Sequence, residues 1–438
     1  MTTSLILTII NALFFVLFLS IYVIKKKFDL GALILTIYTI ANITSIYFYW
    51  FTNESQYSVF YEENYDFSNV SLIPMLYFNI ALLICIYPIL TLKDRKIKIE
   101  SKPNFKLLYG LSVIISILAI DPVLENLIQC FKTGQGTSSN SLGAIYDNDI
   151  NIDNNLSWIG RKLNYILKIF EMVTPILFFY LLSQYKVTKK RISIIVIIGL
   201  GIAMLNPLLN GYATASRVMI VKYFLYIGVC YMLCKPALNA NLIKRINKVG
   251  LIFCSCFIVL TFLITLARFQ YNTSNKTEEN STVWSWISLY SGEGILRFNT
   301  QMWHTKVHTK GDNSFSLPKT ILGLKTFKSN DQRRKYWESK MKIQTNVFFT
   351  FIGDFYSDLG KVGTIFFCLI LSLILKKLIT PHYNTISIEA LILTAIIVQI
   401  YIFGFTFYVY KTYDSQIMIL YPIIISILLH IKRKMNLQ

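Results

Sequence analysis

The stretch that decides the fold is residues 3–24, TSLILTIINALFFVLFLSIYVI, which runs directly into Lys25, Lys26 and Lys27. It carries no charged side chain, and it is long enough for an α-helix to cross the roughly 30 Å hydrocarbon core of a bilayer. No basic residue precedes it and no small-residue cleavage site follows it, so we expect a retained anchor rather than a signal peptide. The sequence thus predicts a membrane-spanning helix with its lysines in water.

The rest of the chain also has the composition of a membrane protein. Of its 438 residues, 54% are hydrophobic and 15% are charged, whereas soluble domains carry about 25% charged residues. This excludes a soluble enzyme. Ten more apolar runs follow the first, at residues 30–51, 72–92, 107–120, 162–184, 192–209, 218–234, 249–267, 362–379, 385–405 and 415–431. We therefore predict an all-α polytopic membrane protein with eleven transmembrane helices.

Most of the net charge of +20 lies in alternate loops between the predicted spans. These basic segments are residues 25–27, 93–106, 186–191, 235–248, 376–377 and 432–434. Cytoplasmic loops are enriched in Lys and Arg, so the pattern places the N-terminus outside and the C-terminus inside. The charge therefore reports orientation, and no nucleic-acid partner is expected.

The outer face carries three long polar segments. Residues 52–71 and 121–160 are acidic, but residues 268–361 hold 14 Lys and Arg against 8 Asp and Glu. The positive-inside rule does not apply to loops of that length, so it neither forbids nor explains this surplus of positive charge. The chain thus divides into eight spans with external loops at 1–267, a basic external loop at 268–361, and three spans with a cytoplasmic tail at 362–438.

The basic loop is also rich in aromatic residues. They include Trp284, Trp286, Tyr290, Trp303, Tyr336 and Trp337. Its first part, residues 284–303, is predicted to lie at the headgroup level as an amphipathic helix. Aromatic faces stack on sugar rings, while Arg and Lys hold phosphate oxygens, so the loop suits an anionic lipid-linked saccharide. Interfacial anchoring with a solvated charged face is the competing interpretation.

Ionisable residues inside predicted spans are costly and are functional candidates. Lys168 and Glu171 lie three apart on the fifth span, where an ion pair between helices and a substrate contact are both open. Arg217 begins the seventh span, and Lys222 lies deeper in it. Residues 206–211, NPLLNG, are expected to break the sixth span and to free backbone groups that only a cavity would tolerate. The sequence thus predicts an outward-facing cationic cavity.

Metal-binding patterns are weak. Cys230 and Cys234 are one helical turn apart, but no second pair with ligand spacing accompanies them, so apolar packing is the better interpretation. His304 and His308 have the spacing of a helical metal pair, but no Glu follows His304. Seven cysteines form no disulfide framework. We predict neither a metal site nor a cofactor.

Three stretches of the external side resemble the O-antigen polymerase family. They are residues 211–217, GYATASR; residues 290–299, YSGEGILRFN; and residues 345–348, TNVF, continued by GDFYSDLGKVG at 353–363. The last is similar to an Asn-aromatic, Tyr-x-Asp-aromatic-Gly signature, with Leu359 where the family usually has Phe. Their order and their side of the membrane agree with the family across nearly the whole chain.

A second spacing also resembles the family. Gly228 follows Arg217 after ten intervening residues, as in an Arg-x10-Gly pattern described for the family. Arg268 and Arg297 have no glycine at that distance. A second copy of the pattern is therefore missing or altered.

The resemblance implies a metal-independent glycosyltransferase of GT-C-like architecture in the bacterial inner (plasma) membrane, multi-pass, with its active face external or periplasmic. Its substrates would be polyprenyl-diphosphate-linked oligosaccharides, such as undecaprenyl diphosphate derivatives. The growing chain would move from its lipid to the non-reducing end of another lipid-linked unit during O-antigen or capsule biosynthesis. The implied partners are the lipid bilayer and a membrane protein that regulates chain length.

The leaving group of that reaction is a lipid diphosphate, so guanidinium groups should stabilise its developing charge. The candidates for diphosphate binding are, in order of preference, Arg217, Arg297 and Arg268, with Lys222 beside them. Acceptor activation needs a base, for which the candidates are Glu293, Asp358 and His304. Helix capping or turn formation beside Gly360 competes with catalysis for Asp358.

Two other functions share the same features. An O-antigen ligase would use a similar donor but transfer it to a lipid A core acceptor. A flippase for lipid-linked oligosaccharides would also need a cationic cavity, although such transporters usually show repeated halves and short loops. Analysis of the reaction products distinguishes a ligase from a polymerase. Transport of lipid-linked units without lengthening would identify a flippase.

Overall fold

A computed structural model describes most of the chain. The described residues are 3–26, 28–54, 67, 69–92, 98–100, 105–135, 156–185, 194–214, 216–275, 283–324, 327, 329–345, 348–380 and 385–435. They form two compact units. The first unit comprises Met1–Lys93, Asn280–Ile379 and Ile397–Ile419, and the second comprises Asp94–Glu279, Thr380–Ile396 and Leu420–Gln438. Much of the predicted external loops 52–71 and 121–160 lies outside the described residues.

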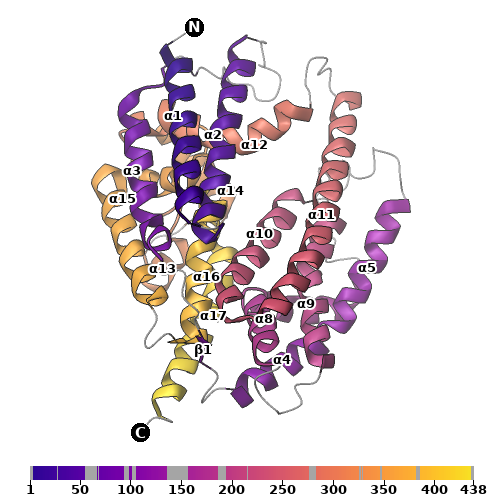
Figure 1. The fold of residues 1–438 in the computed structure, drawn as a ribbon. Helices are drawn as coiled ribbons and strands as arrows, with labels where there is room; N and C mark the ends of the chain where they lie inside the picture. The colour runs from indigo at the N-terminus through magenta and orange to yellow at the C-terminus, as the bar shows by residue number, and fades with distance from the viewer. Residues whose placement is uncertain are drawn as a thin grey trace. The chain divides into compact units, whose positions relative to one another are not determined.

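The first unit is built around three helices that lie side by side, α1 (Thr3–Lys25), α2 (Leu30–Glu54) and α3 (Leu72–Leu90) (Figure 1). Three buried asparagines join them, because Asn79 donates to Asn11 (2.7 Å) and Asn11 donates to Asn42 (2.5 Å). Amide side chains form interhelical hydrogen bonds of this kind inside membranes, where water is absent. The triad therefore fixes the mutual positions of the first three predicted spans.

The basic loop of the sequence folds mainly into short helices of the first unit. They are α12 (Val283–Thr300), the 3₁₀ helix η3 (Met302–His304), α13 (Ser316–Ile321), α14 (Asn330–Met341) and the start of α15 (Thr350–Ile379). α15 contacts α3, and a non-helical residue, Gly360, divides it with φ +67°. The predicted span 362–379 is therefore the second part of a kinked helix.

α12 does not lie on the surface as an amphipathic helix, contrary to the expectation for residues 284–303. It contacts α2, and every residue from Gly292 to Asn299 is buried. Glycines permit this close approach: a Cβ at Gly292 would lie 2.6 Å from the backbone nitrogen of Ser45, and one at Gly294 would lie 2.8 Å from the carbonyl oxygen of Phe405. The Ser-Gly-Glu-Gly sequence is thus explained by helix packing.

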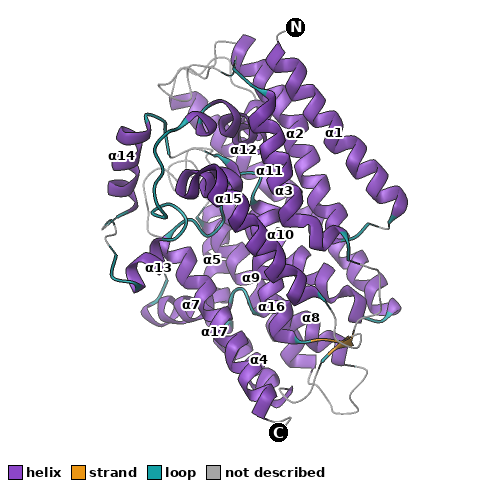
Figure 2. Ribbon diagram, turned by 90° about the vertical axis from the view of Figure 1, so that its left-hand side faces the viewer, coloured by secondary structure: helices purple, strands orange, loops and turns teal. Residues whose placement is uncertain are grey.

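The second unit is also helical, and it holds the two strands found in the described residues (Figure 2). Its elements are β1 (Lys98–Ile99), α4 (Phe105–Leu118), α5 (Ile120–Gln135), α7 (Trp158–Phe170), α8 (Thr174–Gln184), α9 (Ile194–Ala213), α10 (Arg217–Cys234), η2 (Lys235–Ala237), α11 (Ala240–Asn275) and β2 (Thr385–Ile386). Two last helices, α16 (Ile388–Phe403) and α17 (Tyr413–Met435), contribute residues to both units.

The predicted break in the sixth span is wrong. α9 runs without interruption from Ile194 to Ala213 and includes Pro207. The polar residue at the expected break is used for packing, because Asn206 donates to Asn164 (2.8 Å) and accepts from Asn126 (2.9 Å). This second asparagine triad joins α9 to α7 and α5, so its polar atoms need no cavity.

Three segments predicted to be cytoplasmic, together with the start of the predicted span 385–405, lie together in the second unit. β1 pairs in parallel with β2, and η2 contacts β1. Arg433 in the C-terminal basic cluster forms ion pairs with Glu100 (2.9 Å) and Glu389 (3.1 Å). Four segments from distant parts of the sequence are therefore on the same side, which is consistent with the loop charges.

The structure supports a smaller number of spans than eleven. In the part of the chain that is described, nine helices are long and apolar enough to cross a membrane, or ten if the pair α7 and α8 counts as one span. That pair is bent by 68°, so the predicted fifth span is broken rather than straight. The run at 385–405 forms α16, which has 16 residues. The chain is an all-α, multi-pass membrane protein.

Candidate functional site

The predicted diphosphate-binding residues of the second unit lie on α10 and α11. Arg217 begins α10, and its Nη1 donates to Thr265 (3.3 Å). Lys222 is one and a half turns further along α10 and interacts electrostatically with Glu171. Arg268 lies within α11, and its side chain is outside the described part. Arg217 and Lys222 are thus brought to one helix, as the sequence predicts.

Glu293 and Arg297 form a buried ion pair on α12. Each side chain is 1% exposed, and Arg297 also donates to Gln301 (2.8 Å). Burial raises the pKa of the Glu293 carboxyl from 4.5 to about 7, against the lowering effect of Arg297. A pKa near neutrality suits a general base, but a base must also reach the acceptor hydroxyl. The burial of Glu293 favours a structural ion pair.

This pair predicts a pH-dependent stability. The folded state binds the Glu293 proton more tightly than the unfolded state, so its stabilising contribution is complete below pH 4.5 and is lost as pH rises through about 7. We expect the free energy of unfolding to fall by on the order of 2 kcal/mol across this range. Thermal unfolding of purified protein from about pH 5 to 8, compared with Glu293→Gln, measures it. Equal slopes for both proteins would contradict the prediction.

His304, the third candidate base, is exposed at the end of η3. His308 lies against Gly360, where a Cβ would be 3.0 Å from His308 Nε2. Among the described residues, no three His, Cys, Asp or Glu side chains converge as metal ligands.

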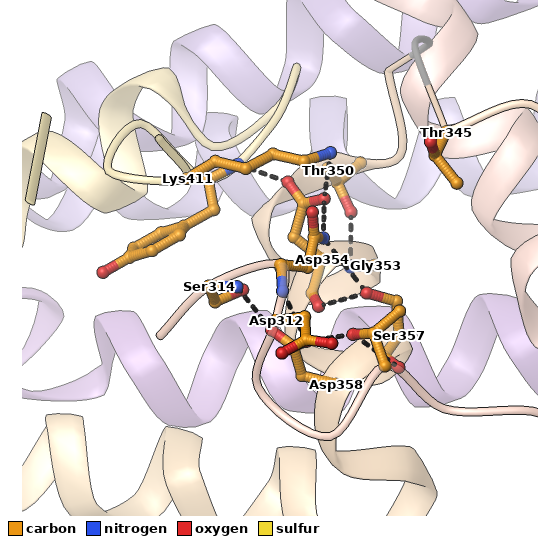
Figure 3. A network of polar contacts seen from close by, with 12 residues as sticks. Asp312, Ser314, Thr345, Thr350, Gly353, Asp354, Ser357, Asp358 and Lys411 are labelled. Atoms are coloured by element: carbon orange, nitrogen blue, oxygen red, sulfur yellow. Dashed lines mark hydrogen bonds and ion pairs between the residues drawn. The ribbon is translucent and has the colours of Figure 1, made fainter. Parts of the chain in front are cut away.

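Asp358, the remaining candidate base, holds a loop that is distant in sequence. Its carboxylate is 3% exposed and accepts hydrogen bonds from the backbone nitrogens of Gly311 (3.1 Å), Asn313 (3.0 Å) and Ser314 (2.7 Å), and from the hydroxyl of Thr309 (Figure 3). Such a set of bonds leaves little accepting capacity for a substrate proton. Asp358 therefore positions residues 309–314, which agrees with the turn-forming interpretation.

Asp354, one helical turn earlier on α15, has a different role. It accepts from Lys411 (2.9 Å), from the Asn313 amide (2.8 Å) and from the backbone nitrogen of Tyr408 (2.7 Å), as Figure 3 shows for Lys411. Thr350 begins this helix with a strained φ of +67°, and its hydroxyl accepts from Gly353. Backbone strain of that kind concentrates at functional sites. Asp354 thus follows a strained helix start by one turn and pairs with Lys411.

Asp354 and Lys411 line a cavity of about 310 Å³ within the first unit. Polar groups of Thr309, Asn313, Asn330, Asp331, Arg333, Arg334, Thr345, Ser357 and Thr412 face it, together with Met302, Trp337, Met341, Phe348, Phe349 and Phe407. A cavity that combines several converging polar groups with aromatic walls is the usual form of a small-molecule site. Its volume is at the lower end of such sites. Glu293 and Arg297 are not among the lining residues.

Most charges at this cavity are already compensated. Lys319 pairs with Asp312, and Lys411 pairs with Asp354. Arg333 donates to the carbonyl oxygens of Asp312 (3.1 Å) and Asn313 (3.4 Å), so it also holds the loop. Burial lowers the pKa of Arg333, and the neighbouring aspartates oppose that shift. These cations therefore neutralise buried carboxylates, and they are poorly suited to a new anion.

Arg334 is the exception among the lining cations. Its ion pair with Asp331 is long, at 3.6 Å, and both side chains are exposed, at 36% and 76%. Exposed pairs of this geometry contribute about 0–1 kcal/mol, so Arg334 can turn to a ligand at little cost. The Trp337 indole lines the same cavity and donates to Asp312 (3.1 Å), which fixes its ring. Arg334 and Trp337 thus offer a guanidinium and an aromatic face.

The cavity is built largely from residues that the sequence did not single out. Arg333, Arg334 and Trp337 belong to the basic, aromatic segment NDQRRKYWESK, which contributes to the charge surplus of the loop, but the surplus itself pointed to no position. Lys411 lies in a short, aromatic-rich stretch between α16 and α17, and the sequence did not single it out.

No protein-family model matches the chain, and neither the curated proteins nor the solved structures contain a significant match. The fold and the site therefore define the class of the chain by themselves. It is a helical, multi-pass membrane protein with a polar cavity that is lined by residues between η3 and the start of α15 and by residues at 407–412.

Proposed function

We propose that this protein is a membrane-embedded glycosyltransferase that polymerises polyprenyl-diphosphate-linked oligosaccharides on the external face of a bacterial inner membrane. The observation that carries the proposal is the cavity in which Asp354, Lys411, Arg334 and Trp337 converge. It lies in the segment that the loop charges assign to the outside. The resemblance of residues 211–217, 290–299 and 345–363 to O-antigen polymerases supports the same function.

The lining residues match the parts of such a substrate. Trp337 offers an aromatic face for a sugar ring, and the amide and hydroxyl groups offer partners for sugar hydroxyls. Arg334 offers parallel N–H donors for the diphosphate oxygens. A balanced set of charges with one adaptable arginine suits a largely neutral glycan that ends in an anionic linkage.

The proposed reaction is a displacement at the anomeric carbon of the donor. The acceptor hydroxyl oxygen forms the new bond to that carbon, and its proton passes to the carboxylate of Asp354. The bond from the anomeric carbon to the diphosphate oxygen breaks, and the lipid diphosphate leaves with the electron pair. Arg334 stabilises the charge that develops on it. Asp354 keeps one lone-pair position, on Oδ2, for the proton, since three hydrogen bonds reach its carboxylate.

The test is a product analysis with purified protein in proteoliposomes. Labelled lipid-linked repeat units are supplied on the face that corresponds to the outside, and the products are separated by length. A ladder of longer lipid-diphosphate-linked chains is expected. Transfer only to an added lipid A core would show a ligase, and movement of the units across the bilayer without lengthening would show a flippase. Either result would overturn the proposal.

A further inference from the structure

A basic and aromatic stripe runs along one face of α7 in the second unit. Trp158, Arg161, Lys162, Tyr165 and Lys168 recur at helical spacings of three and four residues, so their side chains lie above one another. With Asn164 they line a cavity of about 490 Å³. Arg161 and Lys162 are exposed. The cavity therefore presents three cations and two aromatic rings.

No carboxylate belongs to the described lining of this α7 cavity, unlike the cavity of the first unit. Two acids lie near α7. Glu125 of α5 lies against Gly160 and accepts from the backbone nitrogen of Ser157 (3.0 Å) at the start of α7. Glu171 follows the end of α7, where it interacts first with Lys222 and then with Lys168. The stripe thus carries a local excess of positive charge.

The surroundings of the stripe are apolar and exposed. Ile159 and Ile166 flank it on α7, with 58% and 36% of their side chains exposed, and Trp158 and Tyr165 are 71% and 65% exposed. Trp and Tyr favour the membrane–water interface, where lipid headgroups lie. Phosphate groups are the anions that Arg and Lys bind in such positions. The occupant that fits is therefore a lipid with a phosphate-bearing headgroup.

We propose that the α7 cavity binds the diphosphate headgroup of a second lipid-linked substrate. This inference rests on the proposed function, because a reaction that joins two lipid-linked molecules must hold two headgroups at once. The cavity of the first unit has one adaptable cation, Arg334, and serves one of them. The α7 stripe serves the other. Its three cations favour a diphosphate over a phosphodiester headgroup, which carries only a single negative charge.

The test counts bound lipids. Purified wild-type protein in detergent is titrated with undecaprenyl diphosphate that carries no sugar, and the complexes are resolved by native mass spectrometry. Two bound lipids per chain are expected for the wild type and one for Arg161→Ala/Lys162→Ala, with the lost site weakened by at least about tenfold. Lys244→Ala/Arg245→Ala, an exposed Lys–Arg pair on α11, is the charge-matched control and should keep both lipids.

Each outcome is decisive. Two lipids bound with wild-type affinity by the Arg161→Ala/Lys162→Ala protein would overturn the inference, and so would displacement by phosphatidylglycerol as effective as by undecaprenyl diphosphate. Competition by inorganic pyrophosphate on the unmutated protein checks the headgroup without any substitution. Binding does not require turnover. If the Arg161→Ala/Lys162→Ala protein lost one lipid but the wild-type protein never elongated glycans, the α7 site would be supported and the polymerase proposal would be contradicted.

Discussion

Replacing Arg334 by alanine is expected to slow chain elongation by about 10²–10³-fold, which is the usual effect of removing one group that stabilises developing charge in a transition state. The guanidinium lines the cavity of the first unit, and its pairing with the exposed Asp331 is weak. Its loss should therefore cost little stability. The measurement is the rate of formation of lengthened lipid-linked products in proteoliposomes, together with the unfolding temperature.

The neighbouring residue provides the matched control. Lys335 follows Arg334 on α14, is exposed, and does not line the cavity. Lys335→Ala removes the same charge and should leave elongation unchanged. Arg334→Lys should recover part of the rate, since a lysine keeps the charge but loses the paired donors. Equal rates for Arg334→Ala and Lys335→Ala would exclude Arg334 from the reaction.

Asp358→Ala is expected to cause the largest loss of stability. Three backbone N–H groups and the Thr309 hydroxyl would lose their acceptor. An unsatisfied buried donor costs about 1–3 kcal/mol, so a total on the order of 4 kcal/mol follows after partial relaxation of the loop. Thermal or denaturant unfolding of the purified protein measures the change. Asp331→Ala on the exposed face of α14 is the control and should change stability by less than about 0.5 kcal/mol.

The same variant separates the two interpretations of Asp358. If its carboxylate only positions residues 309–314, activity and stability should fall together, and a stabilising condition should restore part of both. An Asp358→Asn protein that keeps its full unfolding temperature but makes no product would instead identify Asp358 as the base. That result would contradict the assignment of Asp354 to this step.

The sequence by itself determined the membrane class, the helical architecture and the positions of most spans. These follow from local quantities, because the bilayer core requires about 20 apolar residues per helix and alternate basic loops set the orientation. Residues 3–24 illustrate this, since α1 occupies Thr3–Lys25. The Gly360 turn beside the last part of the basic loop was also readable, because a glycine there adopts a positive φ.

Whether a helix is continuous or broken was harder to predict from the sequence. Pro207 suggested a break in α9 that does not occur, because α9 continues through it and two asparagines bond to Asn206. The predicted fifth span, by contrast, is bent by 68° between α7 and α8. Both outcomes depend on neighbouring helices rather than on the local sequence.

Only the tertiary structure decided the site. Buried charge requires a nearby partner, and partners are set by packing between segments far apart in the chain. Lys411 reaches Asp354 across 57 positions, and the loop at Asn313 reaches Asp358 across 45. The sequence showed the total excess of Lys and Arg over Asp and Glu in residues 268–361. Some of its cations neutralise buried aspartates, whereas Arg334 remains adaptable. That difference depends on distances between side chains, which no sequence pattern contains.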